Sequence, residues 1–229
     1  ERNPELFNEK EKRFLSMFFG INGEREHTSI ELSKALDIPV PRIVKTYKEI
    51  LEKVKADIIR LKDNSFVIIA TDLCIVNRMD ENHNVDWGDI SSNASKCISF
   101  WKSDDLIHFS PQELKYFGRD DFGCLWAPEI FYNEDDDEYI IHFSATVKAD
   151  GYQKMAIYYT KTKDFENFTM PKLFFEKACG VFDSHLVKIG DTYHLFYKTS
   201  AEPLMNMHAT SNLLFGKWQH DYDFQKYMQ

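Results

Sequence analysis

The sequence predicts a mainly β protein, a β-propeller, preceded by a small all-α domain of the helix-turn-helix type. Three observations predict this fold. In residues 5–56 apolar residues recur at three- and four-residue spacings, which is typical of helices. From residue 57 onward the spacing changes to two, with β-branched and aromatic residues, as in strands. Within residues 57–229 the same order of strand, turn, strand and polar signature occurs three times, as in propeller blades.

The composition is that of a globular protein and excludes several classes. Of 229 residues, 43% are hydrophobic and 28% are charged, and no apolar run approaches the roughly 18 residues that span a bilayer. The formal net charge of −9 excludes a wholly basic coat for nucleic acid. The charge is uneven, because residues 1–56 carry 11 basic and 10 acidic side chains and the remainder carries 17 and 27. This asymmetry predicts two domains, residues 1–56 and 57–229, with different partners.

The four cysteines are far apart and form no C-x-x-C motif, which argues against a zinc knuckle or a redox pair. We therefore expect free, mostly buried thiols in a reducing compartment and a cytoplasmic location, with no membrane partner. The sequence contains no P-loop and no dinucleotide fingerprint. We expect no cofactor.

Residues 5–56 are expected to form three helices. Thr28 is followed three residues later by Glu31, which predicts an N-cap and the start of a short helix. Residues 37–39 form a turn, and a longer helix follows. A short helix, a tight turn and a longer helix make a helix-turn-helix pattern, and a small helical domain for protein contacts is the alternative. The apolar stripes are formed by Leu6, Phe14, Leu15, Phe18 and Phe19, then Ile30, Leu32 and Leu36, then Ile43, Tyr47, Ile50, Leu51 and Val54.

This helical domain resembles region 4 of bacterial sigma factors, which reads the upstream promoter element with its second helix. The resemblance is carried by Leu6 and by residues 9–13 (EKEKR), 18–23 (FFGING), 29–33 (SIELS) and 36–38 (LDI). It implies contacts with promoter DNA and with RNA polymerase. The sequence departs from the family at the start of the recognition helix, where Val40 and Pro41 replace polar or charged residues. Arg42 and Lys45 remain on the groove-facing side, and Lys48 is a candidate phosphate contact.

Residues 57–229 contain three repeats, so about three blades are expected. A sandwich is the alternative fold, but it does not predict the same order three times. The strand pairs are 58–61 with 66–71, 129–132 with 139–145, and 185–188 with 193–198, and the signatures are 101–109, 160–168 and a looser copy at 210–218.

These repeats resemble the five-bladed propeller glycosidases of glycoside hydrolase family 43. The most distinctive segment is 123–132 (GCLWAPEIFY), with its W-A-P-E motif. Members of the family hydrolyse arabinose- and xylose-containing plant glycans with inversion. The other matching segments are 58–60 (IIR) with 69–73 (IATDL), 102–106 (KSDDL) and 181–184 (VFDS).

The resemblance implies three carboxyl groups: a general base, a general acid, and a third group that tunes the pKa of the acid. Asp183 matches the tuning position. Lys55 occupies the position of the base, and Asp57, on the same strand face, is the shifted candidate. The family's acid opens a fourth blade, which we expect to begin about where this sequence ends. Glu202 is the candidate nearby.

Other side chains are candidates for sugar binding. Trp126 and Trp101 offer flat apolar faces, Glu129 can accept hydrogen bonds from sugar hydroxyls, and His185 either contacts ligand or packs. The acidic run 134–138 lacks the spacing of a calcium loop and is interpreted as a solvated turn, so we expect no metal.

The sequence thus favours a carbohydrate-responsive transcription regulator. In this hypothesis a non-catalytic propeller binds pentose-containing oligosaccharides, and the helical head contacts promoter DNA or RNA polymerase. An active inverting glycosidase of the arabinofuranosidase or xylosidase type, with an accessory helical domain, is the alternative. A purely structural interaction module is a third.

Overall fold

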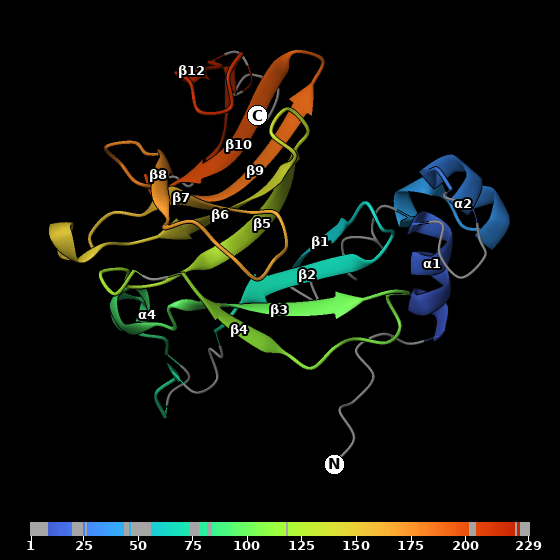
Figure 1. Cartoon of the computed structure of the whole chain (residues 1–229), viewed down its shortest axis with the longest axis horizontal. Helices are drawn as coiled ribbons and strands as arrows, with labels where there is room; N and C mark the ends of the chain where they lie inside the picture. The colour runs from blue at the N-terminus through green and yellow to red at the C-terminus, as the bar shows by residue number, and fades with distance from the viewer. Residues whose placement is uncertain are drawn as a thin grey trace. The chain divides into compact units, whose positions relative to one another are not determined.

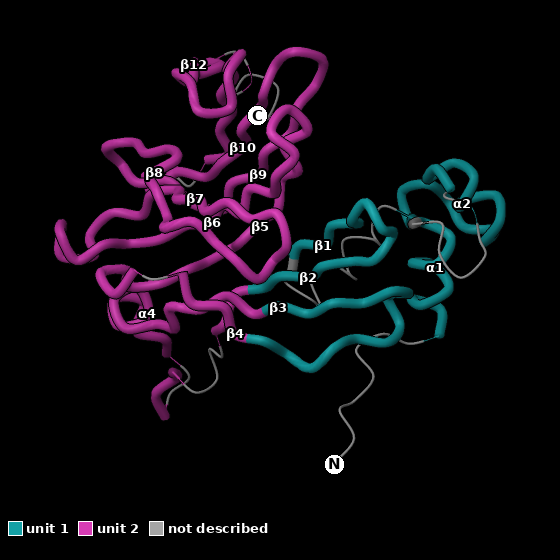
Figure 2. Tube along the Cα trace, in the orientation of Figure 1, with its two compact units in different colours: residues 1–70, 100–113 teal, residues 71–99, 114–229 magenta. Residues whose placement is uncertain are grey.

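The computed structural model describes residues 9–19, 25, 27–43, 46, 56–73, 78–81, 84–117, 119–201, 205–222 and 224. The described residues are mainly β, with helices at the start of the chain and three four-stranded sheets after them (Figure 1). The chain divides into two compact units, residues 1–70 with 100–113, and residues 71–99 with 114–229 (Figure 2).

The second helix begins and ends where the sequence signals place it. Helix α1 covers Glu9–Phe19 and α2 covers Ser29–Leu36. Thr28 caps α2: its backbone N–H donates to Glu31 Oε2 at 2.9 Å, and its hydroxyl accepts from the Glu31 N–H at 3.3 Å. Asp37, at φ 53°, ends α2 in the left-handed region. Residues 40–43 are again helical.

Phe109 joins two hydrophobic clusters of the first unit. One cluster lies among the helices and contains Phe14, Leu32 and Ile43. The other lies on the strands and contains Phe66, together with Ile68 and Leu106. Phe109 is half-buried and packs against both. Phe109 therefore contributes to the packing of the helices against the strands within this unit.

Each of the three sheets consists of four strands that follow one another in the sequence, which confirms the predicted threefold repeat. The first has the order β1-β2-β3-β4, the second β5-β6-β7-β8 and the third β12-β11-β10-β9. Every pairing of the second and third sheets is antiparallel. A short helix, α4 (Trp87–Asn93), precedes β3. The strands are β1 Ala56–Arg60, β2 Phe66–Thr71, β3 Cys97–Ser103, β4 Glu113–Tyr116, β5 Trp126–Asn133, β6 Glu138–Ala145, β7 Ala156–Thr162, β8 Lys172–Phe175, β9 Val181–Ile189, β10 Thr192–Thr199, β11 Asn206–Ser211 and β12 Gln219–His220.

The repeated polar signature is a hydrogen-bonded turn. In the first copy Asp105 Oδ1 accepts from the backbone N–H groups of Ile107 and His108. In the second copy Asp164 Oδ1 accepts from two backbone N–H groups in the same way. The hydrogen bonds from Asn167 hold the pKa of the Asp164 carboxyl below its usual range. The signature therefore stabilises the turn after the third strand of each of these two sheets.

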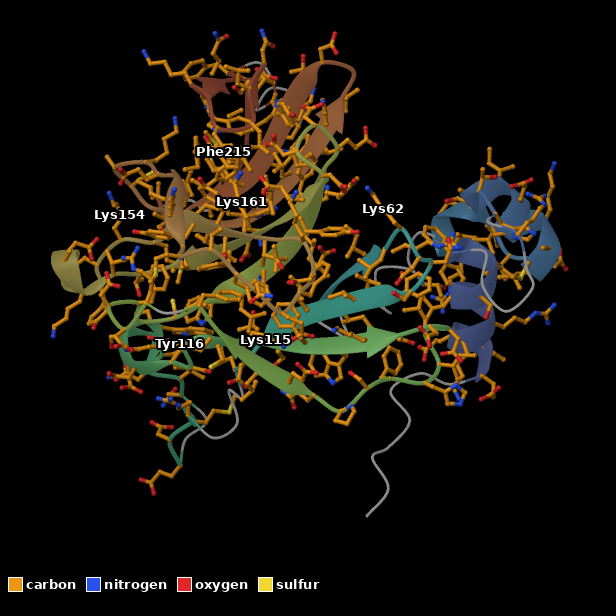
Figure 3. All side chains as sticks on the ribbon, viewed as in Figure 1. Lys62, Lys115, Tyr116, Lys154, Lys161 and Phe215 are labelled. Carbon is orange, nitrogen blue, oxygen red and sulfur yellow. The ribbon has the colours of Figure 1, made fainter. Side chains whose placement is uncertain are left out.

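The second and third sheets share one core within the second unit. It contains Ile140, Ile157, Leu186 and Leu195, all buried. In the same unit Lys161 Nζ lies 4.7 Å from the centroid of the Phe215 ring, a cation–π contact (Figure 3). Among the described helices, none is long and apolar enough to cross a membrane.

Candidate functional site

The W-A-P-E segment forms the start of β5 and contains a β-bulge. Trp126 pairs with Ser144 and Glu129 pairs with His142, and the register shifts between these two pairs. Ala127 adopts a positive φ of 45°, and Pro128 has no N–H to donate to the ladder. The bulge thus interrupts the hydrogen-bonded ladder of β5 and β6 between Trp126 and Glu129.

Gly123 allows the segment before β5 to approach its neighbours closely. Its N–H donates to the carbonyl of Thr146, and its own carbonyl accepts from the N–H of Ala94, at 3.0 and 2.9 Å. A Cβ at position 123 would lie 2.2 Å from the carbonyl oxygen of Ser91 and 2.6 Å from the hydroxyl of Thr146. Only glycine fits here without displacing backbone atoms.

A second bulge, in β9, presents Asp183. His185 pairs with Phe196 and Phe182 pairs with Lys198, so residues 183 and 184 together oppose one residue of β10. Asp183 adopts a φ of 49° and is exposed, whereas Ser184 is buried. Lys198 Nζ donates to Asp183 Oδ2 at 3.0 Å. The ammonium therefore offsets part of the charge of this carboxylate.

Glu129 lies between two imidazoles. His185 Nδ1 is 2.8 Å from Glu129 Oε2, within hydrogen-bonding distance. His142 Nε2 is 4.0 Å from the same oxygen, and Nδ1 of His142 is 2.9 Å from the Ser184 hydroxyl. The second and third sheets thus meet at a carboxylate that has an imidazole ring on either side.

His142 is buried, and this burial controls its charge. It is 1% exposed, and burial lowers the pKa of its imidazole to about 4, against the opposing effect of Glu129. His142 is therefore neutral at neutral pH.

A pH dependence of stability follows from this pKa. Because the folded pKa lies below the unfolded one, the unfolded chain binds the proton first as the pH falls through about 6.5 toward 4. We expect this residue to reduce the free energy of unfolding by about 2 kcal/mol between about pH 7.5 and about pH 5. Urea unfolding of the wild type and of His142→Phe at both pH values measures it. An equal pH dependence in the two proteins would contradict the assignment.

Two tryptophans lie beside these polar groups. The rings of Trp126 and Trp87 meet edge to face, with centroids 6.3 Å apart. Trp126 is half-buried, and its indole N–H is buried without a hydrogen-bond partner among the described residues. Trp87 is 57% exposed. The two rings therefore form one aromatic contact between α4 and the start of β5.

Of the residues predicted from the sequence, the structure brings Glu129 and His185 into contact, and it places Trp126 and Asp183 next to the same residue, Ser144. Asp57 lies in β1 and is half-buried. Trp101 lies in β3 and packs against the strand cluster of the first unit. Arg42 is exposed, whereas Glu202, Lys45 and Lys48 lie outside the described residues.

Three residues of the site were missed by sequence reasoning: His142, Ser144 and Lys198. His142 and Ser144 are polar residues at alternate positions of an otherwise apolar strand, and this signal could have found them. In the acidic run 134–138, residues 134–137 form the turn between β5 and β6 and Glu138 begins β6; Asp135 Oδ2 accepts from Lys188 Nζ at 3.1 Å. The described residues contain no group of three or more side chains placed to hold a metal ion.

Comparison with known proteins identifies similar chains. Residues 55–228 match the model of a family described as a probable glycosyl hydrolase domain, related to family 43. The chain is 26% identical over 153 residues to an α-L-arabinofuranosidase of Bifidobacterium longum subsp. longum. The match covers 59% of this chain but only 14% of that protein.

Two solved structures share the fold. One is Zg3597, a family 117 glycoside hydrolase from the marine bacterium Zobellia galactanivorans, with a TM-score of 0.52 and 12% identity over 73% of this chain. The other is BT0996, solved as an RGII complex, with a TM-score of 0.51 and 12% identity over 71% of this chain. The chain spans 54% and 50% of these two proteins. The likeness supports the propeller-like assignment of the sheets.

Proposed function

Because the chain belongs to the family of probable glycosyl hydrolase domains, we propose that its second unit binds arabinose- or xylose-containing oligosaccharides. The arrangement around Glu129 carries the proposal. A carboxylate accepts hydrogen bonds from sugar hydroxyls, the imidazole of His185 beside it adds a polar group, and the indole of Trp126 offers an apolar face. The arabinofuranosidase relative supports a pentose as the sugar.

We propose further that this unit binds without hydrolysis. Hydrolysis with inversion requires a base and an acid on opposite sides of the scissile bond. Lys55 stands at the position that matches the base. Asp183 is paired with Lys198, so its negative charge raises the pKa of a neighbouring acid less than an unpaired carboxylate would. In the alternative, an active hydrolase, Asp57 acts as base, Glu202 as acid and Asp183 as the tuning group.

Calorimetry of the full chain with arabinotriose and xylotriose tests the binding. Glu129→Gln keeps the shape of the side chain but removes its charge, so we expect the dissociation constant to rise about tenfold. Glu176→Gln is the matched control, since Glu176 is an exposed carboxylate that pairs with Lys154 at 2.6 Å.

Three outcomes decide between the proposals. Equal affinity of the wild type and Glu129→Gln would remove Glu129 from the site. Binding of neither sugar would favour an interaction module. Release of arabinose or xylose that Asp183→Asn abolishes would show a hydrolase instead.

For the helical head we propose contact with promoter DNA or RNA polymerase, biased by bound sugar. Three features support it: the capped helix α2, the left-handed turn at Asp37, and the helical residues 40–43, where Arg42 is exposed. Fluorescence anisotropy of labelled promoter DNA with polymerase, measured with and without arabinotriose, tests the role. No change in anisotropy on adding this chain would contradict it.

A further inference from the structure

Two buried polar residues of β6 face the bulge in β9. Ser144 is fully buried and His142 is 1% exposed, and both project from the same face of the strand because they are two residues apart. The other side chains of β6 are mostly apolar, from Tyr139 to Ala145. Buried polar groups are unfavourable unless they are paired, so the partners of these two residues indicate their purpose.

Ser144 contacts the backbone of Asp183. Its hydroxyl oxygen accepts a hydrogen bond from the Asp183 N–H at 3.0 Å. The bulge removes this N–H from the ladder, because residue 183 has no partner in the register of β9 and β10. The positive φ of Asp183 is a conformation that needs support from its surroundings, and Ser144 supplies it from the neighbouring sheet.

His142 connects the other half of the bulge to Glu129. Its Nδ1 is 2.9 Å from the hydroxyl of Ser184, and its Nε2 is 4.0 Å from the Glu129 carboxylate. One imidazole therefore contacts the residue after Asp183 and also approaches Glu129. Together with Ser144 it links the two carboxyl-bearing segments of the site through one strand.

We propose that Ser144 and His142 are positioning residues for the sugar site: Ser144 fixes Asp183 in its left-handed turn, and His142, the strand neighbour of Glu129, holds Ser184 of that turn beside Glu129. This inference rests on the proposed function, because it assumes that the carboxylates of Asp183 and Glu129 bind sugar. Residues of β6 then set the distance between these two carboxylates. Neither residue contacts the sugar in this arrangement. Both act through the carboxylates that do.

A double-mutant cycle separates positioning from simple loss of stability. Ser144→Ala is expected to weaken arabinotriose binding about fivefold, the size of one lost hydrogen bond. In an Asp183→Ala background the same change is expected to alter affinity less than about twofold: the N–H at position 183 remains, but the carboxylate through which Ser144 acts on the sugar is gone. Thr160→Val is the control: Thr160 is fully buried in β7, and its hydroxyl donates to the carbonyl of Thr169, outside the site. It should lower the melting temperature without changing affinity.

His142→Phe provides the second cycle, since phenylalanine keeps the ring and removes both nitrogens. We expect weaker binding in the wild-type background and no further loss in Glu129→Gln. The proposal is wrong if Ser144→Ala and His142→Phe bind arabinotriose as tightly as the wild type does. It is also wrong if each substitution weakens binding by the same factor in the Asp183→Ala or Glu129→Gln background as in the wild type.

Amide hydrogen exchange keeps the inference testable if no sugar binds. By NMR, the Asp183 amide is expected to exchange at least about tenfold faster in Ser144→Ala than in the wild type, and to be unchanged in Thr160→Val. An unchanged rate in Ser144→Ala would overturn the positioning role of Ser144. The exchange rate of the Asp183 amide depends on the hydrogen bond from Asp183 to Ser144 and not on sugar. If exchange is faster in Ser144→Ala but no sugar binds, the proposed function is rejected and the positioning role of Ser144 stands.

Discussion

Gly123→Ala is expected to lower the free energy of unfolding by about 4 kcal/mol, a large share of the roughly 5–15 kcal/mol that is typical of native proteins. The added Cβ would lie 2.2 Å from the Ser91 carbonyl oxygen, and a backbone atom cannot move aside as a flexible side chain can. Relief would require breaking the hydrogen bonds of Gly123 with Thr146 and Ala94. Urea unfolding followed by tryptophan fluorescence measures the loss, because Trp126 lies three residues away in the same segment.

Gly88→Ala is the matched control for this prediction. Gly88 lies in α4, and a Cβ there would meet only the side chain of Asp86, at 3.2 Å. Alanine favours a helix over glycine, so its effect should stay within about 1 kcal/mol. An unfolding midpoint of Gly123→Ala close to that of Gly88→Ala would show that the segment before β5 has room that the structure does not contain.

Phe109→Ala is expected to lower the free energy of unfolding by about 3 kcal/mol and to separate the helices from the sheet in unfolding. Phe109 packs against the helical cluster and the strand cluster, so its loss removes contacts from both. Helix content followed by circular dichroism should then melt at a lower temperature than strand structure followed by infrared absorption. In the wild type we expect the two probes to coincide.

Leu173→Ala is the control for Phe109, because Leu173 is 46% exposed at the edge strand β8. It should change the melting temperature little and keep the two probes coincident. Coincident melting of Phe109→Ala at the wild-type temperature would contradict the role of this ring.

Most of the fold could be predicted because it depends on local patterns. Strand periodicity placed β2 at residues 66–71, and the Thr28 and Glu31 pair placed the start of α2. The repeat predicted three sheets of similar order. The two bulges could not be predicted, since alternation of apolar and polar residues assumes a continuous ladder. Pro128 was the one local signal, because it has no N–H for the ladder of β5.

The site was predicted where its residues belong to a motif or, like His185, lie next to one. Trp126 and Glu129 come from the W-A-P-E segment, and Asp183 from the VFDS segment. His142 and Lys198 belong to strands, and the alternation of apolar and polar residues in a strand does not predict which residues they contact in a neighbouring sheet or across a bulge. Their hydrogen bonds depend on tertiary packing, and a sequence pattern does not contain it.

The ion pair of Asp183 and Lys198 makes the site sensitive to dissolved salt. Both side chains are substantially exposed, 40% and 45%, so mobile counterions reach them. At low ionic strength the ammonium is held against the carboxylate. In concentrated salt their attraction is screened, so we expect the two side chains to separate more often. The buffer therefore sets how often the Asp183 carboxylate is open to another partner.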